Sequence, residues 1–136
     1  MATEFTQFLP YGRQLIDDDD VAAVERVLRS DWLTTGPAVD EFERVLAEKV
    51  GTKDAVACAN ATAGLHLAVL CLQLEAGDLV VVPSVTFLAT ANVVRHVGAE
   101  VIFADVDPST GLMGPEQLEE VISRANAGPL KAVIPV

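Results

Sequence analysis

GDLVVVPSVTFLATANVVRHVGAEVIFADVD, residues 77–107, is the stretch that decides the fold. Its apolar run Leu79–Val82 predicts a strand that ends at Pro83, because proline cannot donate a hydrogen bond to a sheet. Thr86–Val97 has the spacing of a helix, and residues 99–107 predict the next strand. Continuous apolar strands that alternate with helices are typical of a parallel sheet covered on both faces. We therefore expect a three-layer α/β/α fold with a mainly parallel sheet.

The same alternation extends over the rest of the chain. Further strands are expected at Ala55–Ala59 and in KAVIPV, residues 131–136. Further helices are expected after the N-cap Asp17, at Val39–Val50, at Thr62–Leu74 and from Pro115 to about Arg124. In such sheets ligands bind beyond the carboxyl ends of the strands. Three segments follow strand ends and are candidates for function: 60–64, 83–87 and 105–107.

The segment from Ala61 to Gly64 reads Ala-Thr-Ala-Gly and joins a predicted strand to a predicted helix. Small side chains let a ligand approach the backbone, and a helix N-terminus offers free N–H groups and a positive dipole end. The pattern indicates a seat for an anion such as a phosphate. The alternative is an ordinary N-capped helix.

Composition excludes several classes of partner. The 136 residues carry a formal net charge of -11, with 20 acidic residues against 9 Lys and Arg, and no basic patch. Such a surface repels nucleic acid and anionic membranes. No signal peptide or apolar run long enough to span a bilayer is visible, so we expect a cytoplasmic protein. The two cysteines, Cys58 and Cys71, are expected to be buried free thiols.

No complete catalytic or metal-binding constellation is visible. The chain has two histidines, His66 and His96, and neither has a partner at metal-ligand spacing. We expect both to be structural and expect no metal. The run Asp17–Asp20 is explained by helix capping, with a cation site as the alternative.

Four stretches, taken in order, resemble one known family: LPYGRQLIDDDDVAAVERVLRSDWLTTGP, ACANATAGLHLAVLCLQLEAGD, VVPSVTFLATANVVRHVGAEVIFADVD and KAVIPV. They are similar to the N-terminal part of the large domain in the DegT/DnrJ/EryC1/StrS family. These are pyridoxal-phosphate-dependent nucleotide-sugar aminotransferases of fold type I. The resemblance implies that residues 1–136 form part of that domain. It also implies a nucleotide-linked 4-keto sugar as substrate, glutamate as amino donor, a role in surface polysaccharide precursors, and a homo-oligomer.

The resemblance also implies site residues. Ala61, Thr62 and Ala63 match the segment that holds the cofactor phosphate, and Phe87 matches the aromatic residue that stacks on the pyridine ring. A core phenylalanine is the alternative for Phe87. Positions near the substrate are implied for Tyr11, Arg13, Thr35, Gly36 and Asn92. A simple turn between two helices is the alternative for residues 34–36.

The family's catalytic lysine and the aspartate that binds the pyridinium nitrogen match nothing in this sequence. Lys131 precedes a strand, whereas the family's lysine follows several later elements. We therefore expect a fragment without a catalytic residue of its own, inactive alone and with weak or no cofactor binding. Alternatives are a non-catalytic, self-associating α/β module and an unrelated nucleotide binder. In the family's strand order Ala55–Ala59 would lack its neighbours, so we do not expect a stable monomer in that order.

Overall fold

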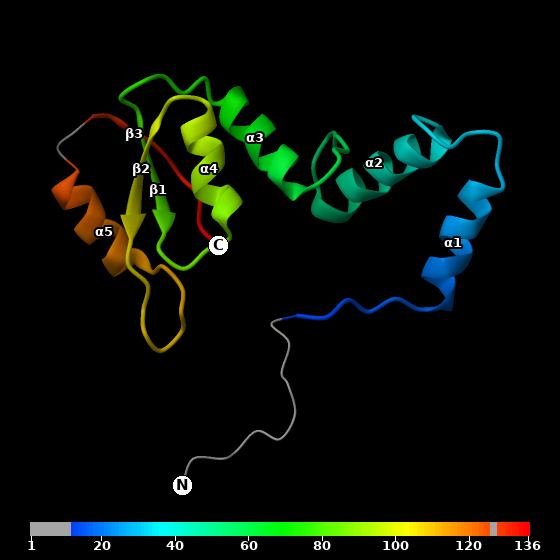
Figure 1. The fold of residues 1–136 in the computed structure, drawn as a ribbon, viewed down its shortest axis with the longest axis horizontal. Helices are drawn as coiled ribbons and strands as arrows, with labels where there is room; N and C mark the ends of the chain where they lie inside the picture. The colour runs from blue at the N-terminus through cyan, green and yellow to red at the C-terminus, as the bar shows by residue number, and fades with distance from the viewer. Residues whose placement is uncertain (1–11, 126–127) are drawn as a thin grey trace, which may run out of the picture. The chain divides into compact units, whose positions relative to one another are not determined.

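The structure is a computed structural model that describes residues 12–125 and 128–136. The chain divides into two compact units, Met1–Ala57 and Cys58–Val136, which are treated separately below. Figure 1 shows the order of the elements along the chain.

The first unit contains two helices, α1 (Asp18–Leu28) and α2 (Pro37–Val50). The Asp17 carboxylate accepts hydrogen bonds from the backbone N–H groups of Asp19 and Asp20, and the Asp20 side chain accepts one from the Asp17 N–H. This reciprocal capping box confirms the predicted role of Asp17. Helix α2 ends at Gly51, whose φ of 72° is the left-handed conformation that glycine adopts most easily.

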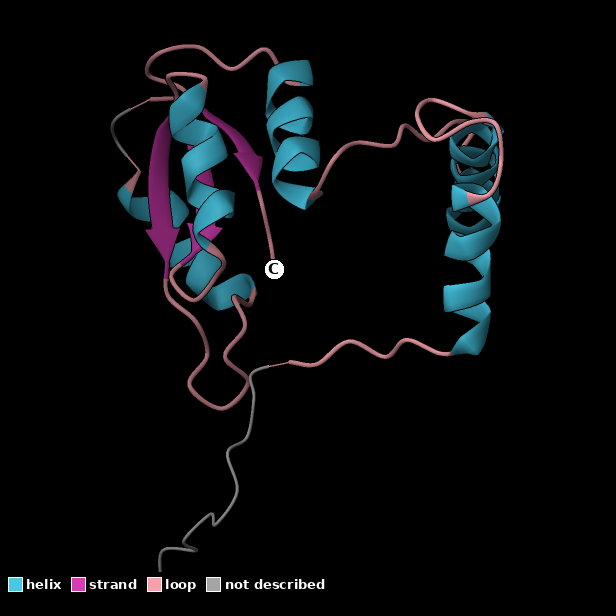
Figure 2. Cartoon of the chain, turned by 45° about the vertical axis from the view of Figure 1, so that its right-hand side comes forward, coloured by secondary structure: helices cyan, strands magenta, loops and turns pink. Residues whose placement is uncertain are grey.

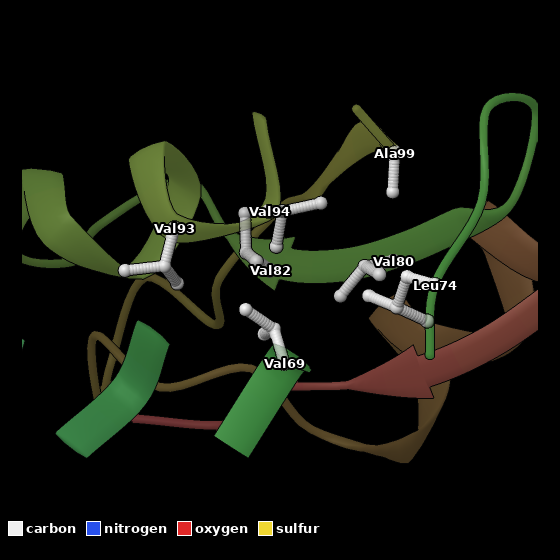
Figure 3. Close-up of a cluster of buried hydrophobic side chains, with 7 residues drawn as sticks. All are labelled: Val69, Leu74, Val80, Val82, Val93, Val94 and Ala99. Atoms are coloured by element: carbon white, nitrogen blue, oxygen red, sulfur yellow. The ribbon is translucent and has the colours of Figure 1, made fainter. Parts of the chain in front are cut away.

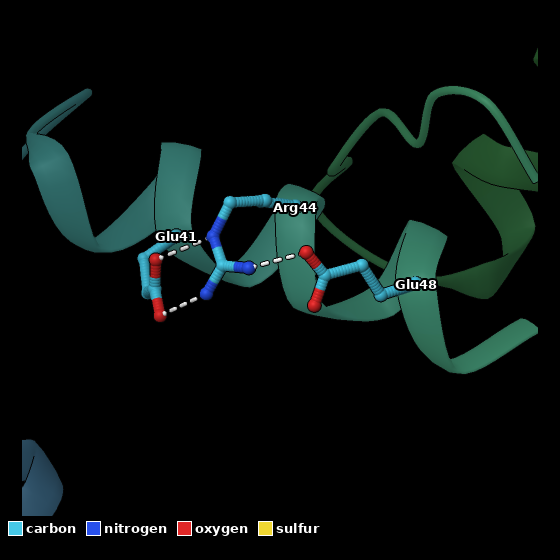
Figure 4. A network of polar contacts seen from close by, with 3 residues as sticks. All are labelled: Glu41, Arg44 and Glu48. Carbon is cyan, nitrogen blue, oxygen red and sulfur yellow. Dashed lines mark hydrogen bonds and ion pairs between the residues drawn. The ribbon is translucent and has the colours of Figure 1, made fainter.

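Charged side chains line one face of α2. The Arg44 guanidinium donates hydrogen bonds to the carboxylates of Glu41 and Glu48, one helical turn to either side (Figure 4). Both bonds favour the charged guanidinium, so the pKa of Arg44 is raised above its ordinary value, with the bond to Glu41 as the larger cause. All three side chains are exposed, so the network keeps this face solvated rather than fixing the fold.

The predicted strand at Ala55–Ala59 is not formed. Residues 54–58 have no regular secondary structure, and the Ala57 N–H donates to the Glu43 carboxylate at 2.7 Å. A strand needs a hydrogen-bonded neighbour on at least one side, and no described strand lies beside this segment. The prediction of a strand at Ala55–Ala59 was therefore wrong. The cause is the lack of neighbouring strands that the family's strand order had already implied for this segment.

The second unit is built on a three-stranded parallel sheet. Its strands are β1 (Leu79–Pro83), β2 (Glu100–Ala104) and β3 (Leu130–Val133), in the order β2-β1-β3. Its helices are α3 (Ala61–Cys71), α4 (Leu88–His96) and α5 (Pro115–Arg124). The predicted parallel α/β fold is confirmed. Three of the four expected strands are present in the described residues.

Alternate residues of the central strand face opposite layers, as strand geometry requires. Val80 and Val82 pack with Val69 of α3 and Val93 of α4 (Figure 3). Val81 packs on the other face, against Val121 of α5. Both faces of β1 are therefore covered, and this explains why its sequence is apolar without alternation.

The three strands end at one edge of the sheet, called the carboxyl edge below. Helices α3 and α4 run back along the sheet, so the N-terminal ends of both lie toward this edge (Figures 1 and 2). The predicted anion seat on α3 and the Phe87 turn before α4 are therefore on the same side of the second unit.

Candidate functional site

The N-terminus of α3 is the first component of the candidate site. Asn60 is its N-cap, and the Asn60 side-chain oxygen accepts a hydrogen bond from the Ala63 N–H at 2.9 Å. Among the described residues nothing accepts from the N–H groups of Ala61 or Thr62. Two of the three predicted backbone donors are thus free, and Ala63 can reach an anion only if the Asn60 side chain turns away.

Gly64 has a structural reason for its small size. A Cβ atom at this position would lie 3.3 Å from the Cys58 sulfur, and the Cys58 thiol itself donates to the Asn60 carbonyl oxygen at 3.3 Å. A side chain at Gly64 would therefore crowd the Cys58 sulfur, which gives this glycine a structural reason independent of any ligand. The hydrogen bond from the Cys58 thiol fixes the backbone just before the N-cap of α3, and the sequence pattern did not suggest this contact.

Both cysteines are free, as predicted, but both are exposed rather than buried. The prediction of burial was wrong for two different reasons. Cys58 lies in a segment that forms no strand, so no sheet neighbour covers it. Cys71 is the last residue of α3, two residues beyond the buried Val69 and on a different side of the helix.

Phe87 is the second component. It is the N-cap of α4, and its side chain is 75% exposed. The turn before it is held by the Thr86 hydroxyl, which donates to the hydroxyl of the buried Thr90 at 3.0 Å, and the Thr90 N–H donates to the Phe87 carbonyl at 3.0 Å. The aromatic ring is therefore presented to solvent by an ordered turn, and packing in the core of this unit is not its role.

The residues predicted to lie near the substrate fall in different parts of the chain. Asn92 lies on α4 and is exposed. Thr35 and Gly36 belong to the first unit, Asn92 belongs to the second, and Tyr11 lies outside the described residues.

The loop at Thr35 and Gly36 is tight for a reason of its own. Thr35 has a φ of 47°, a left-handed conformation that is uncommon for a residue with a side chain. Gly36 is buried, and a Cβ atom there would lie 2.6 Å from the Trp32 Cβ. Gly36 is thus required by the turn between α1 and α2, whatever else this loop contacts.

The third segment that follows a strand end is a closed loop after β2. The Asp107 carboxylate accepts hydrogen bonds from the Ser109 hydroxyl and from the N–H groups of Ser109 and Thr110. These bonds, led by that of the Ser109 hydroxyl, hold the pKa of Asp107 below its ordinary value. The Asp107 carboxylate therefore hydrogen-bonds within its own loop and stabilises the conformation of that loop.

Sequence spacing missed one pair of residues. His66 on α3 and His96 on α4 lie with their ring centroids 5.7 Å apart and their planes at 69°. They are 30 positions apart in the sequence, and only the packing of the two helices brings them together.

The fold is that of an α/β protein with a parallel sheet, and in such proteins ligands bind beyond the carboxyl ends of the strands. Within that class the chain belongs to the DegT/DnrJ/EryC1/StrS aminotransferase family, whose sequence model matches residues 14–136.

Solved structures agree with this assignment. A DegT DnrJ EryC1 StrS aminotransferase from Brucella abortus is 42% identical over 85% of this chain, with a TM-score of 0.73. The putative sugar aminotransferase Spr1654 from Streptococcus pneumoniae, in its PLP form, is 35% identical over 83% of this chain, with a TM-score of 0.72. The E. coli GDP-4-keto-6-deoxy-D-mannose-3-dehydratase with bound hydrated PLP is 28% identical over 93% of this chain, with a TM-score of 0.79.

These comparisons support pyridoxal phosphate (PLP) as the cofactor of the family, because Spr1654 is known in PLP and PMP forms. The chain covers 32%, 29% and 33% of the lengths of the three relatives in the order given. In the part of the chain that the structure describes, no helix has the length and apolar character needed to cross a membrane.

Proposed function

We propose that this chain supplies the N-terminal part of the large domain of a PLP-dependent aminotransferase that acts on a nucleotide-linked 4-keto sugar. The observation that carries the proposal is the arrangement at the carboxyl edge of the second unit. The free N–H groups of Ala61 and Thr62 and the exposed ring of Phe87 lie at the N-terminal ends of two neighbouring helices.

The donor set fits a phosphate ester joined to an aromatic ring. Two backbone N–H groups, the Thr62 hydroxyl and the dipole of an 11-residue helix all favour a negative charge at the start of α3. The exposed face of Phe87 offers the flat apolar surface on which a pyridine ring stacks. When bound, PLP supplies the electron sink that amino-group transfer requires, while these residues bind and orient it.

We assign the substrate side of the site to Tyr11, Thr35, Gly36 and Asn92, on the strength of their match to the family. Amination is favoured over dehydration, because the aminotransferases above are 42% and 35% identical and the dehydratase is 28% identical. A keto-sugar nucleotide, glutamate as amino donor, and a role in surface polysaccharide synthesis complete the proposal.

The chain alone is proposed to be inactive. Its three lysines are Lys49, Lys53 and Lys131. Lys131 lies near the start of β3, at the edge of the sheet opposite to the proposed site, with its ammonium 3.9 Å from the Asp78 carboxylate. Lys49 and Lys53 belong to the first unit, at the end of α2 and just after it. The position of Lys131 supports a structural role for this residue.

We also propose a homo-oligomeric, cytoplasmic protein. The apolar residues Val21, Val24 and Leu28 of α1 are each more than half exposed, as an association surface requires. Two exposed free thiols fit a reducing compartment. A self-associating, non-catalytic module remains the second candidate, favoured by the same exposed apolar residues.

The experiment that tests the proposed function is an absorbance titration of the chain with PLP. It is made with and without a polypeptide that supplies the C-terminal half of a family member. The proposal expects weak binding alone, and transaminase activity only in the complemented sample. Thr62→Val should weaken binding in both samples, and Val85→Ala, at an exposed position near Phe87, is the matched control. Borohydride reduction that labels one lysine of the isolated chain stoichiometrically, together with activity, would refute the proposal.

A further inference from the structure

One side of α1 is apolar and uncovered. Val21, Val24 and Leu28 follow one another at intervals of three and four residues, so they lie on one side of the helix and are called the α1 stripe below. Together with Ile16, just before the N-cap, they line an open groove of about 560 Å³. Each of these four side chains is more than half exposed, and no residue of α1 is buried in the described structure.

A helix of this length needs a partner. The 11 residues of α1 fall below the length of about 12–15 residues at which even a favourable isolated helix is marginal in water. Most helices in proteins are stabilised by packing of their apolar side, and exposed apolar patches mark sites of association. Some other surface is therefore required to cover the α1 stripe.

The charges of α1 are divided between its two ends. Asp18, Asp19 and Asp20 occupy the first turn. Arg26 lies in the last turn, and Arg29 is the C-cap. A parallel pair of such helices would bring two acidic turns together. An antiparallel pair instead brings the acidic end of each helix beside the basic end of the other and aligns the two helix dipoles favourably, so α1 is complementary in charge to a second, antiparallel copy of itself.

The α1 stripe and the charges agree on one register. With Val24 at a two-fold axis, Val21 of one copy lies within one residue of the level of Leu28 of the other, because these residues lie three positions before and four positions after Val24. Asp18 and Arg29 are about three helical turns apart, so they share one flank of the stripe. Each flank meets the same flank of the partner in such a pair, which brings Asp18 of one copy to the level of Arg29 of the other.

Arg29 can accept a second carboxylate. Its Nε and Nη2 atoms donate to the Glu25 carboxylate, at 2.8 and 2.6 Å, on the same flank. Its Nη1 atom has no partner among the described residues, and the ion pair with Glu25 is exposed. The guanidinium therefore keeps N–H donors for a carboxylate from another copy.

We propose that the α1 stripe is the surface through which two copies of this chain associate, with the two α1 helices antiparallel about a two-fold axis at Val24. The inference rests on the homo-oligomer proposed above and names its contact surface. The contact is isologous and closes at two copies. It is small, so we expect a weak dimer with a Kd on the order of 10–100 µM. Repulsion between two copies of net charge -11 is screened beyond about 8 Å at physiological salt.

The test is sedimentation equilibrium of the full 136-residue chain, from about 5 to about 500 µM in about 0.15 M NaCl. We expect a monomer–dimer equilibrium. Val24→Glu places two like charges at the axis and should weaken the dimer at least about tenfold. Ser123→Glu, at an exposed position of α5, adds the same charge elsewhere and should leave the Kd unchanged. Far-ultraviolet circular dichroism checks the helical content of each variant.

A charge exchange tests the register and does not depend on the folding of any one variant. Asp18→Arg and Arg29→Asp each place like charges opposite one another and should each weaken self-association about threefold or more. An equimolar mixture of the two variants should associate more tightly than either variant alone, because every altered charge then faces one of opposite sign. A change confined to one copy cannot produce this rescue.

The outcomes separate this inference from the proposed function. A monomer at every concentration overturns both the α1 contact and the proposed homo-oligomer. A dimer that Val24→Glu leaves unchanged overturns the α1 contact alone, since another surface then holds the copies together. A mixture that associates no more tightly than its two components overturns the antiparallel register. The proposed cofactor binding and amino-group transfer are tested independently by the PLP titration above.

Discussion

The side-chain oxygen of Asn60 lies 2.9 Å from the backbone nitrogen of Ala63 and accepts its hydrogen bond. The cap thus occupies one of the three N–H groups at the start of α3 and leaves those of Ala61 and Thr62 free. The same residue stabilises the helix and limits how an anion can bind. Stability and anion affinity are therefore coupled at this position.

Substitution of Asn60 should separate the two effects. Asn60→Ala removes the cap and should lower the free energy of unfolding by about 1 kcal/mol, whereas Asn60→Gly should cost only a few tenths of a kcal/mol. Both variants release the Ala63 N–H, so both should bind inorganic phosphate at least as well as the unsubstituted chain. Urea unfolding and phosphate titration measure the two quantities. A clear loss of phosphate binding in Asn60→Gly would argue against the seat.

Capping by Asp17 should control the helical content of α1. The Asp17 carboxylate accepts two backbone hydrogen bonds, and no residue of α1 is buried, so tertiary packing cannot compensate for its loss. Asp17→Ala should reduce the helical signal in far-ultraviolet circular dichroism, at a cost of about 1 kcal/mol to the helix. Asp18→Ala serves as the control, because the Asp18 side chain makes no capping bond in the described structure. Equal loss in both variants would show that the capping box is not the cause.

The loop after β2 should depend on pH through Asp107. Hydrogen bonds from Ser109 and Thr110 lower the pKa of this carboxyl in the folded state. Because the folded pKa lies below the unfolded value of about 3.9, the loop gains stability above that pH and loses it as the pH falls through the folded pKa. Carbon-detected NMR titration of the Asp107 carboxyl measures this. Ser109→Ala should raise its pKa toward the ordinary value, and no change would contradict the assigned cause.

The central strand should be the most sensitive part of the core. Val82 is fully buried between β1 and the α3 and α4 layer, whereas Val85, three residues later, is 62% exposed. Val82→Ala should lower the free energy of unfolding by about 2 kcal/mol, from lost burial and the cavity it leaves. Val85→Ala should change it by less than about 0.5 kcal/mol. Similar values for the two variants, measured by urea unfolding, would contradict this description of the core.

Much of the fold could be predicted because local signals agreed with tertiary packing. The apolar run from Leu79 and the start of α5 at Pro115 gave element types and nearly correct bounds. The segment 55–59 has the same apolar character as a strand, and it failed because pairing depends on neighbours that composition does not supply. The local sequence shows which secondary structure a segment can adopt, but a strand forms only where a neighbouring strand pairs with it.

The sequence predicted the type of candidate site, an anion seat at a helix N-terminus, but not the contacts that its residues make. The small residues around Thr62 indicated an anion seat. The sequence did not indicate that a side chain at Gly64 would crowd Cys58, or that Asn60 accepts the hydrogen bond of the Ala63 N–H. The pairing of His66 with His96 had no signal in sequence spacing, because it arises from the packing of two helices against one sheet face.

The most direct test of the central claim is a two-dimensional NMR titration of the chain with pyridoxine 5′-phosphate, which lacks the reactive aldehyde. The amide resonances of Ala61 and Thr62 should shift in a saturable way at concentrations of about 1 mM, and the Phe87 ring resonances should shift with them. Pyridoxine without the phosphate should leave the two amides unchanged. The account is contradicted if neither amide shifts, or if pyridoxine shifts them as much as its phosphate ester does.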